Sequence, residues 1–155
     1  MAGRADEGYQ CRNMAQEITD PEVVWVEDER KKVLDYLAAE GCKHAGVADW
    51  PTFYVTPHLA LWAVQSTRHV GRTGWWAISG DVPTDYMSSS EGESPQDALR
   101  YFAAGWNDVA GYMRRGEPHP ELELGDPKNW PQMVEELEQR ALALLEYADD
   151  PEIWE

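Results

Sequence analysis

Two apolar segments on either side of a polar turn constrain this chain most. Residues 59–64 read Leu-Ala-Leu-Trp-Ala-Val, so both alternating sets of side chains are apolar. A strand that is apolar on both faces belongs inside a sheet, although so short a run also fits a buried helical turn. After the polar residues 67–73, the run Gly74-Trp75-Trp76-Ala77-Ile78-Ser79 indicates a return strand. We therefore predict an antiparallel hairpin.

The residues that follow predict a turn and a third strand. Glycine, aspartate and proline in Gly80-Asp81-Val82-Pro83-Thr84-Asp85 each favour a turn. Tyr86-Met87-Ser88 then adds a short strand, and residues 88–93 form an exposed loop.

Three amphipathic helices are predicted around this sheet. They cover residues 21–40, 95–115 and 131–148, each with a proline in its first turn and apolar side chains at helical spacing. Gly41 and Gly116 are placed to end the first two helices. The order of elements predicts an α+β fold, in which a small antiparallel sheet is covered by about three helices.

The length of 155 residues fits one domain. Residues 1–12 are polar and lack any period, so we expect a loose N-terminal arm followed by a single α+β domain over residues 13–155. Cys11 and Cys42 form no C-x-x-C pair, and we expect them to be thiols in a reducing compartment.

The charge balance excludes several classes of partner. Thirteen Lys and Arg against 29 Asp and Glu give a formal net charge of −16, which repels nucleic-acid phosphates and anionic lipids. No apolar run approaches the roughly 18 residues that span a bilayer, and the first residues lack the apolar part of a secretory signal. We therefore expect a cytoplasmic protein that binds neither nucleic acid nor membrane.

The segment from Gly74 to Tyr86 carries a family resemblance. Its Gly-Trp-Trp-Ala-Ile-Ser-Gly-Asp-Val-Pro-Thr-Asp sequence, with Leu-Ala-Leu-Trp before it and a Trp-containing helix after it, resembles an uncharacterised bacterial family of small acidic proteins. The likeness covers about residues 30–150. It implies one bacterial domain of unknown function and supplies no catalytic residue.

Polar residues gather at one end of the predicted hairpin. Asp81 and Asp85 flank the turn beside Tyr86, and His58 lies just before the paired strand. Two close carboxylates can divide acid and base roles or hold a divalent cation. The same side chains can also cap free backbone groups of the turn, each worth about 0.5–2 kcal/mol by analogy with helix caps. Both interpretations stay open.

Tryptophan is the most unusual part of the composition, with eight residues. Indole rings anchor cores, and they equally anchor protein interfaces and flat-ligand pockets. Trp75 and Trp76 point to opposite faces if they lie on a strand, so one of them needs cover from a loop, a ligand or a partner. We include both, with Trp62, among the candidate binding residues.

Motifs for metals, nucleotides and nucleophilic catalysis are absent from the sequence. The four histidines share no metal-ligand spacing with one another or with a cysteine: His44, His58, His69 and His119. No P-loop, dinucleotide fingerprint or G-x-S-x-G elbow occurs. We predict neither a metal site nor a cofactor, and we name no catalytic residue.

These observations favour one function over two others. Residues 117–155 hold twelve acidic and two basic side chains, an acidic surface that would complement a basic protein. The first hypothesis is a protein-binding module, of the immunity or toxin-neutralising type, that occludes a basic partner. The alternative is a small ligand-binding domain or enzyme with its site at Asp81, Asp85 and His58. Self-association through apolar patches is the third.

Overall fold

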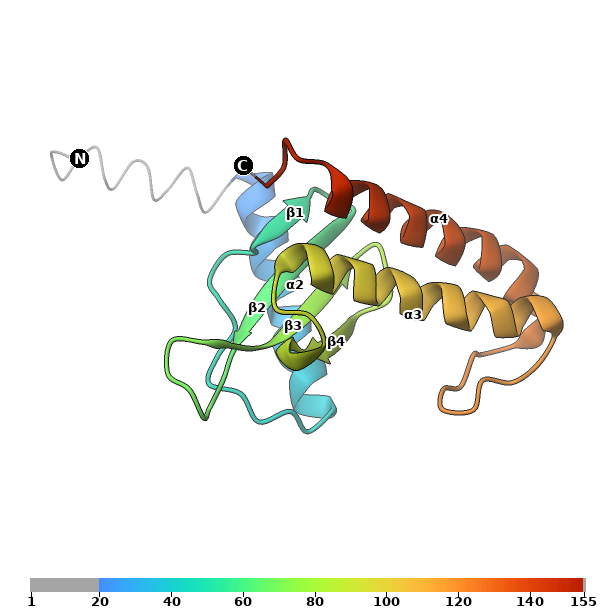
Figure 1. Cartoon of the computed structure of the whole chain (residues 1–155), viewed down its shortest axis with the longest axis horizontal. Helices are drawn as coiled ribbons and strands as arrows, with labels where there is room; N and C mark the ends of the chain where they lie inside the picture. Colours follow the sequence, from blue (N-terminus) through green and yellow to red (C-terminus); the bar gives the residue numbers. More distant parts are fainter. Residues whose placement is uncertain (1–19, 155) are drawn as a thin grey trace, which may run out of the picture. The chain divides into compact units, whose positions relative to one another are not determined.

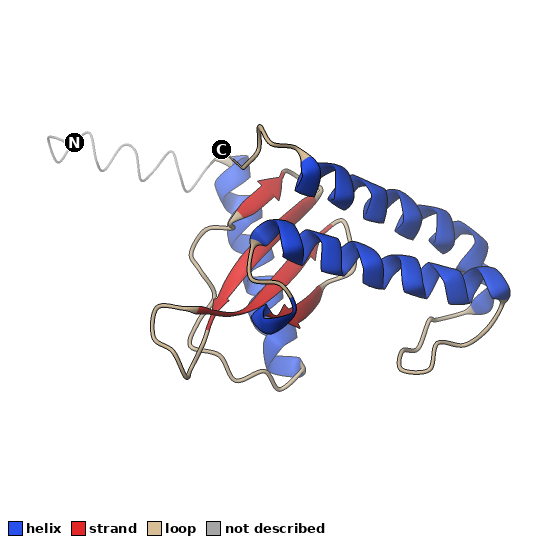
Figure 2. Cartoon of the chain, viewed as in Figure 1, coloured by secondary structure: helices blue, strands red, loops and turns tan. Residues whose placement is uncertain are grey.

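A computed structural model describes residues 20–154, which fall into two compact units divided between Tyr86 and Met87. Figures 1 and 2 trace the helices and strands along the chain. The expected α+β composition is confirmed, with three α-helices and a four-stranded sheet in this part of the chain. The predicted N-terminal arm and Cys11 lie outside the described residues.

The first unit pairs one helix with the sheet. Helix α2 spans Pro21–Ala39, and the strands are β1 (Phe53–Val55), β2 (Leu59–Gln65), β3 (Thr73–Gly80) and β4 (Asp85–Ser88), the last of which crosses into the second unit. The strands lie side by side in the order β1-β2-β3-β4, as labelled in Figure 1. The β1–β2 and β2–β3 pairs are antiparallel, as their short turns require.

Helix α2 begins and packs as its sequence predicts. The Asp20 carboxylate accepts a hydrogen bond from the Glu22 N–H at 2.8 Å, and Pro21 occupies the first turn. Val33 and Leu37 are fully buried on the face that meets the sheet. Beyond the helix, Gly41 adopts a φ of 76°, which favours glycine.

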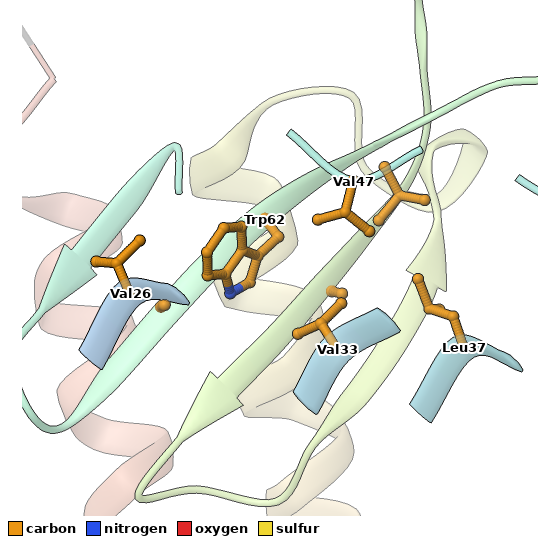
Figure 3. Packing of buried hydrophobic residues seen from close by; sticks show 8 residues of the cluster. Val26, Val33, Leu37, Val47 and Trp62 are labelled. Atoms are coloured by element: carbon orange, nitrogen blue, oxygen red, sulfur yellow. The ribbon is translucent and has the colours of Figure 1, made fainter. Parts of the chain in front are cut away.

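The core of this unit centres on Trp62. Figure 3 shows its indole beside Val26, Val33 and Val47 in the space between α2 and the sheet. The Trp62 Nε1–H donates a hydrogen bond to Ser79 Oγ at 3.2 Å, and both side chains are fully buried. The pair therefore satisfies an indole donor that would otherwise cost about 1–3 kcal/mol.

The predicted hairpin is confirmed, and the sheet holds one more strand than expected. Residues 59–65 and 73–80 pair as β2 and β3, and the third strand is β4. The additional strand, β1, is separated from β2 by a turn at residues 56–58, in which the His58 N–H donates to the Val55 carbonyl at 2.6 Å. Pro57 lacks the N–H that a continuous strand would need, so residues 53–66 divide into two strands.

The second unit is a pair of antiparallel helices, which run side by side in Figure 1. It contains η1 (Ser89–Glu91), α3 (Pro95–Arg115), η2 (Pro127–Asn129) and α4 (Trp130–Asp149). The Ser94 hydroxyl accepts from the Asp97 N–H at 3.1 Å and caps the start of α3. The shared core of the two helices is formed by these buried residues: Ala110, Met113, Trp130 and Val134.

Gly80 allows the end of β3 to lie close to the backbone of the β1–β2 turn. Its φ is +121°, and a Cβ there would lie 2.5 Å from the His58 carbonyl oxygen. Gly46 provides a control, because its φ is +138° but a Cβ would meet nothing within 4 Å. Both alanine variants carry positive-φ strain of about 1–3 kcal/mol, and only Gly80→Ala adds a backbone clash.

We predict that Gly80→Ala lowers the free energy of unfolding by at least about 1 kcal/mol more than Gly46→Ala, a difference in the range of overpacking costs. Urea unfolding followed by circular dichroism measures both variants against the wild type. Equal losses in the two variants would contradict the close approach at Gly80.

Candidate functional site

The three candidate tryptophans lie in or beside the sheet. Trp75 pairs with Val64 and Trp76 with Ala63, so the two indoles point to opposite faces. Trp75 is half-buried against the α2 side of the sheet, whereas Trp76 is only 5% exposed. Trp62 has no exposed surface. In the described structure, Trp62 and Trp76 are therefore buried in packing contacts, and Trp75 is the most accessible of the three.

His58 and Asp81 come together through their backbones. The Asp81 N–H donates to the His58 carbonyl at 2.8 Å, which joins the β1–β2 turn to the residue after β3. Both residues are exposed. The expected proximity of these positions at the hairpin end is thus present.

Asp85 and Tyr86 form a more enclosed group with Tyr36 of α2. Asp85 Oδ1 accepts from the Tyr86 N–H at 2.8 Å and from the Tyr36 hydroxyl at 3.4 Å. The rings of Tyr36 and Tyr86 meet edge to face with centroids 6.0 Å apart. Asp85 therefore caps its own strand, as one of the two interpretations expects, and also contacts a helix that lies far away in sequence.

Burial perturbs the acidities of this group. Desolvation raises the pKa of Asp85 above its ordinary value, although the Tyr86 and Tyr36 hydrogen bonds oppose the rise. Burial, and then the charge of Asp85, raise the pKa of Tyr36 well above its usual range. At neutral pH Tyr36 therefore remains a phenol and acts as a hydrogen-bond donor.

The sequence analysis missed Glu29 and Lys32 of α2, which lie close to the end of β3 at Gly80. Glu29 is 6% exposed, and its Oε2 pairs with Lys32 Nζ at 3.0 Å. Lys32 Nζ also lies 3.4 Å from the Gly80 carbonyl oxygen. No described residue provides a hydrogen-bond partner for Glu29 Oε1. The burial of Glu29 could have been predicted from the sequence, because position 29 lies on the same helical stripe as Val26 and Val33.

A different surface feature lies in the second unit, where the linker of residues 116–126 joins α3 to η2 and α4. A cavity of about 1030 Å³ opens between this linker and the facing ends of the two helices. We call it the linker groove; its walls contain Met113, Leu122, Leu124 and Trp130 together with Arg114, Arg115 and prolines. The sequence analysis predicted no groove at this place.

The imidazole of His119 holds the first half of this linker. Its Nδ1 accepts from the N–H groups of Glu121 and Leu122, at 3.1 and 3.2 Å. Nε2 must then carry the proton that it shares with Asp108 Oδ2, 3.0 Å away. Although His119 and Asp108 resemble an acid–base pair, the nitrogen that would act as the base is already occupied. The role of His119 is therefore structural: its hydrogen bonds hold the linker against α3.

Metal and membrane sites find no support in the described part of the chain. Within residues 20–154, no three His, Cys, Asp or Glu side chains gather in an arrangement that could hold a metal ion. None of the helices over the same residues is long and apolar enough to cross a bilayer.

Taken together, the fold and the two sites define a small α+β protein with a charged hairpin end and an acidic helical pair. Residues 20–154 match the family described as "Domain of unknown function (DUF4826)", and the chain belongs to that family. The expected membership of an uncharacterised family is thereby confirmed. No curated protein and no solved structure matches the chain.

Asp85 makes the stability of the chain depend on pH. Because its folded pKa is raised above the ordinary value of 3.8, the folded state keeps this proton over a pH interval in which the unfolded state has lost it. Stability contributed by Asp85 is therefore full below pH 3.8 and falls as the pH rises through the folded pKa.

We predict that Asp85→Asn gains stability relative to the wild type across that interval, because an amide oxygen can still accept both hydrogen bonds without a charge. Urea unfolding of both proteins between pH 3 and 8 measures the difference, and carbon NMR of the Asp85 carboxyl locates the titration. A stability difference that is constant or falls with pH would refute the prediction.

Proposed function

We propose that this protein is a binding module for a basic protein, which it engages through the acidic surface of residues 87–155. The observation that carries the proposal is the distribution of charge. This unit holds 16 Asp and Glu against five Lys and Arg, whereas residues 1–86 hold 13 against eight. Five cations cannot neutralise 16 carboxylates, so a large negative potential surrounds the helical pair.

Ion pairs within the unit leave this excess in place. Arg100 pairs with Asp97 and Asp149, and Arg114 pairs with Glu138. The outward face of α4 carries an exposed stripe: Gln132, Glu135, Glu136, Gln139, Leu142, Glu146 and Asp149. Such a stripe accelerates encounter with a cationic partner and rejects anionic ones.

We further propose that the partner is a cationic toxin, that binding occludes its active surface, and that both act in the bacterial cytoplasm. Small size, strong negative charge and the lack of catalytic and metal motifs in the sequence support this reading. The class is assigned by analogy with immunity proteins.

The proposal predicts a partner whose association depends on salt. The full chain is used to capture partners at 50 and 500 mM salt, and the captured protein is purified and reconstituted. Neutralising Glu135, Glu136 and Glu146 to glutamine should lower the association rate constant about tenfold at low salt. The matched control neutralises three exposed carboxylates of α2, Glu27, Asp28 and Asp35, and should leave the rate nearly unchanged.

An association rate constant that does not depend on salt, or that falls equally in both triple variants, would count against the acidic surface. For the toxin reading, the purified partner must also inhibit growth when expressed alone, and co-expression of this chain must relieve the inhibition.

A second candidate function rests on Glu29. A buried carboxylate oxygen without a partner costs free energy that a hydrogen-bond donor would recover. We propose that the hairpin end, with Lys32, His58, Asp81 and Asp85, binds a small ligand whose ammonium or hydroxyl group donates to Glu29 Oε1.

Thermal unfolding in the presence of small amines and polyols tests this candidate. A ligand should raise the wild-type Tm through preferential binding to the folded state, and Glu29→Gln should lose most of that rise. Glu27→Gln, an exposed change on the same helix, should retain it. An equal rise in all three proteins, or no rise with any compound, would reject the site.

A further inference from the structure

We infer that the linker groove is the docking point for a basic segment that presents one large apolar side chain. This inference rests on the proposed function and names the place and the chemistry of contact. The segment's apolar side chain would fill the groove, and its lysines and arginines would meet the acidic rim.

The groove is preorganised at both ends. His119 accepts two linker N–H groups and donates to Asp108 of α3, and its ring meets that of Tyr112 edge to face, with centroids 4.8 Å apart. At the other end, the Trp130 Nε1–H donates to the Leu124 carbonyl at 2.9 Å. A partner therefore meets a fixed linker, which reduces the ordering cost of association.

The floor and one wall of the groove are apolar. Met113 and Trp130 belong to the buried core of the helical pair, and Leu124 packs against that core. Leu122 is 54% exposed at the mouth of the groove. A cavity of about 1030 Å³ is more than large enough for one aromatic or aliphatic side chain.

The rim selects a cationic partner. Glu121 and Glu123 flank Leu122, Asp126 follows in the same linker, and all three are exposed. The two arginines of the groove are already engaged: Arg114 with Glu138, and Arg115 with Glu117 at 3.1 Å. An anionic ligand would have to displace these carboxylates, whereas a lysine or arginine side chain finds uncompensated negative charge.

The test uses synthetic 14-residue peptides rich in Lys and Arg, each with a single central Trp, Phe or Leu. Companion peptides carry Ala at the centre or replace the basic residues with Glu. Binding to the full-length, nitrogen-15-labelled chain is followed by NMR, with the variants Leu122→Ser and Leu142→Ser. Leu142 is the matched control, since it is 59% exposed on α4 and does not line the groove.

We expect amide shifts confined to the linker and to the facing helix ends, and about tenfold weaker binding after either the Ala replacement or Leu122→Ser. Applied together, the two changes should weaken binding little beyond either alone, because they remove the same contact. Leu142→Ser should alter affinity less than twofold, and thermal unfolding confirms that both variants are folded.

Two results would overturn the inference, and they are distinguishable. Cationic peptides that bind without regard to the central residue or Leu122 would reject the groove while leaving an acidic binding surface. The absence of binding by any cationic peptide would reject the groove, and a salt-independent reconstituted partner would then reject the proposed function as well.

Discussion

The buried indole of Trp62 is the constraint on which the first unit depends. Its ring fills the space between α2 and the sheet, and its N–H is satisfied by Ser79 from the neighbouring strand. The side chains of an inner strand must fill the core, and because they lie far from water, any polar atom among them also needs a hydrogen-bond partner. The Trp62–Ser79 pair does so within two adjacent strands, and the hydrogen bond is compatible only with their observed register.

The two units divide the properties of the chain. The first places polar groups at one end of the sheet, where desolvation raises the pKa of Asp85. One carboxylate oxygen of Glu29 is also buried there, without a hydrogen-bond partner among the described residues. The second carries most of the negative charge on exposed helical and linker surfaces. Buried, desolvated groups suit a small ligand, whereas exposed like charges suit a large cationic one. The two proposed functions follow from this difference in environment.

Local signals predicted most of the fold, and some of the features that were missed depend on contacts between residues distant in sequence. The caps at Asp20 and Ser94 and the Asp85–Tyr86 cap of β4 depend on residues close in sequence. Arg30, in contrast, interrupts the apolar stripe of α2 because it donates to the carbonyls of Val47 and Ala48, at 2.7 and 3.0 Å. Tyr36 and Asp85 are 49 residues apart in the sequence, and no local pattern predicts their hydrogen bond. The linker groove was missed for another reason: its lining residues all lie between Met113 and Pro131, but they form a groove only because the linker is held by the His119 and Trp130 hydrogen bonds, which no periodic pattern predicts.

The linker between α3 and η2 is held in place independently of the side chains that the proposed docking would use. His119 and Leu124 hold the loop through one ring and one main-chain carbonyl, so the side chains between them take no part in anchoring it. Substitution at positions 121 to 123 should therefore carry little folding cost. If the proposed docking holds, the specificity of this loop could therefore be changed by mutation without altering the two helices that carry it.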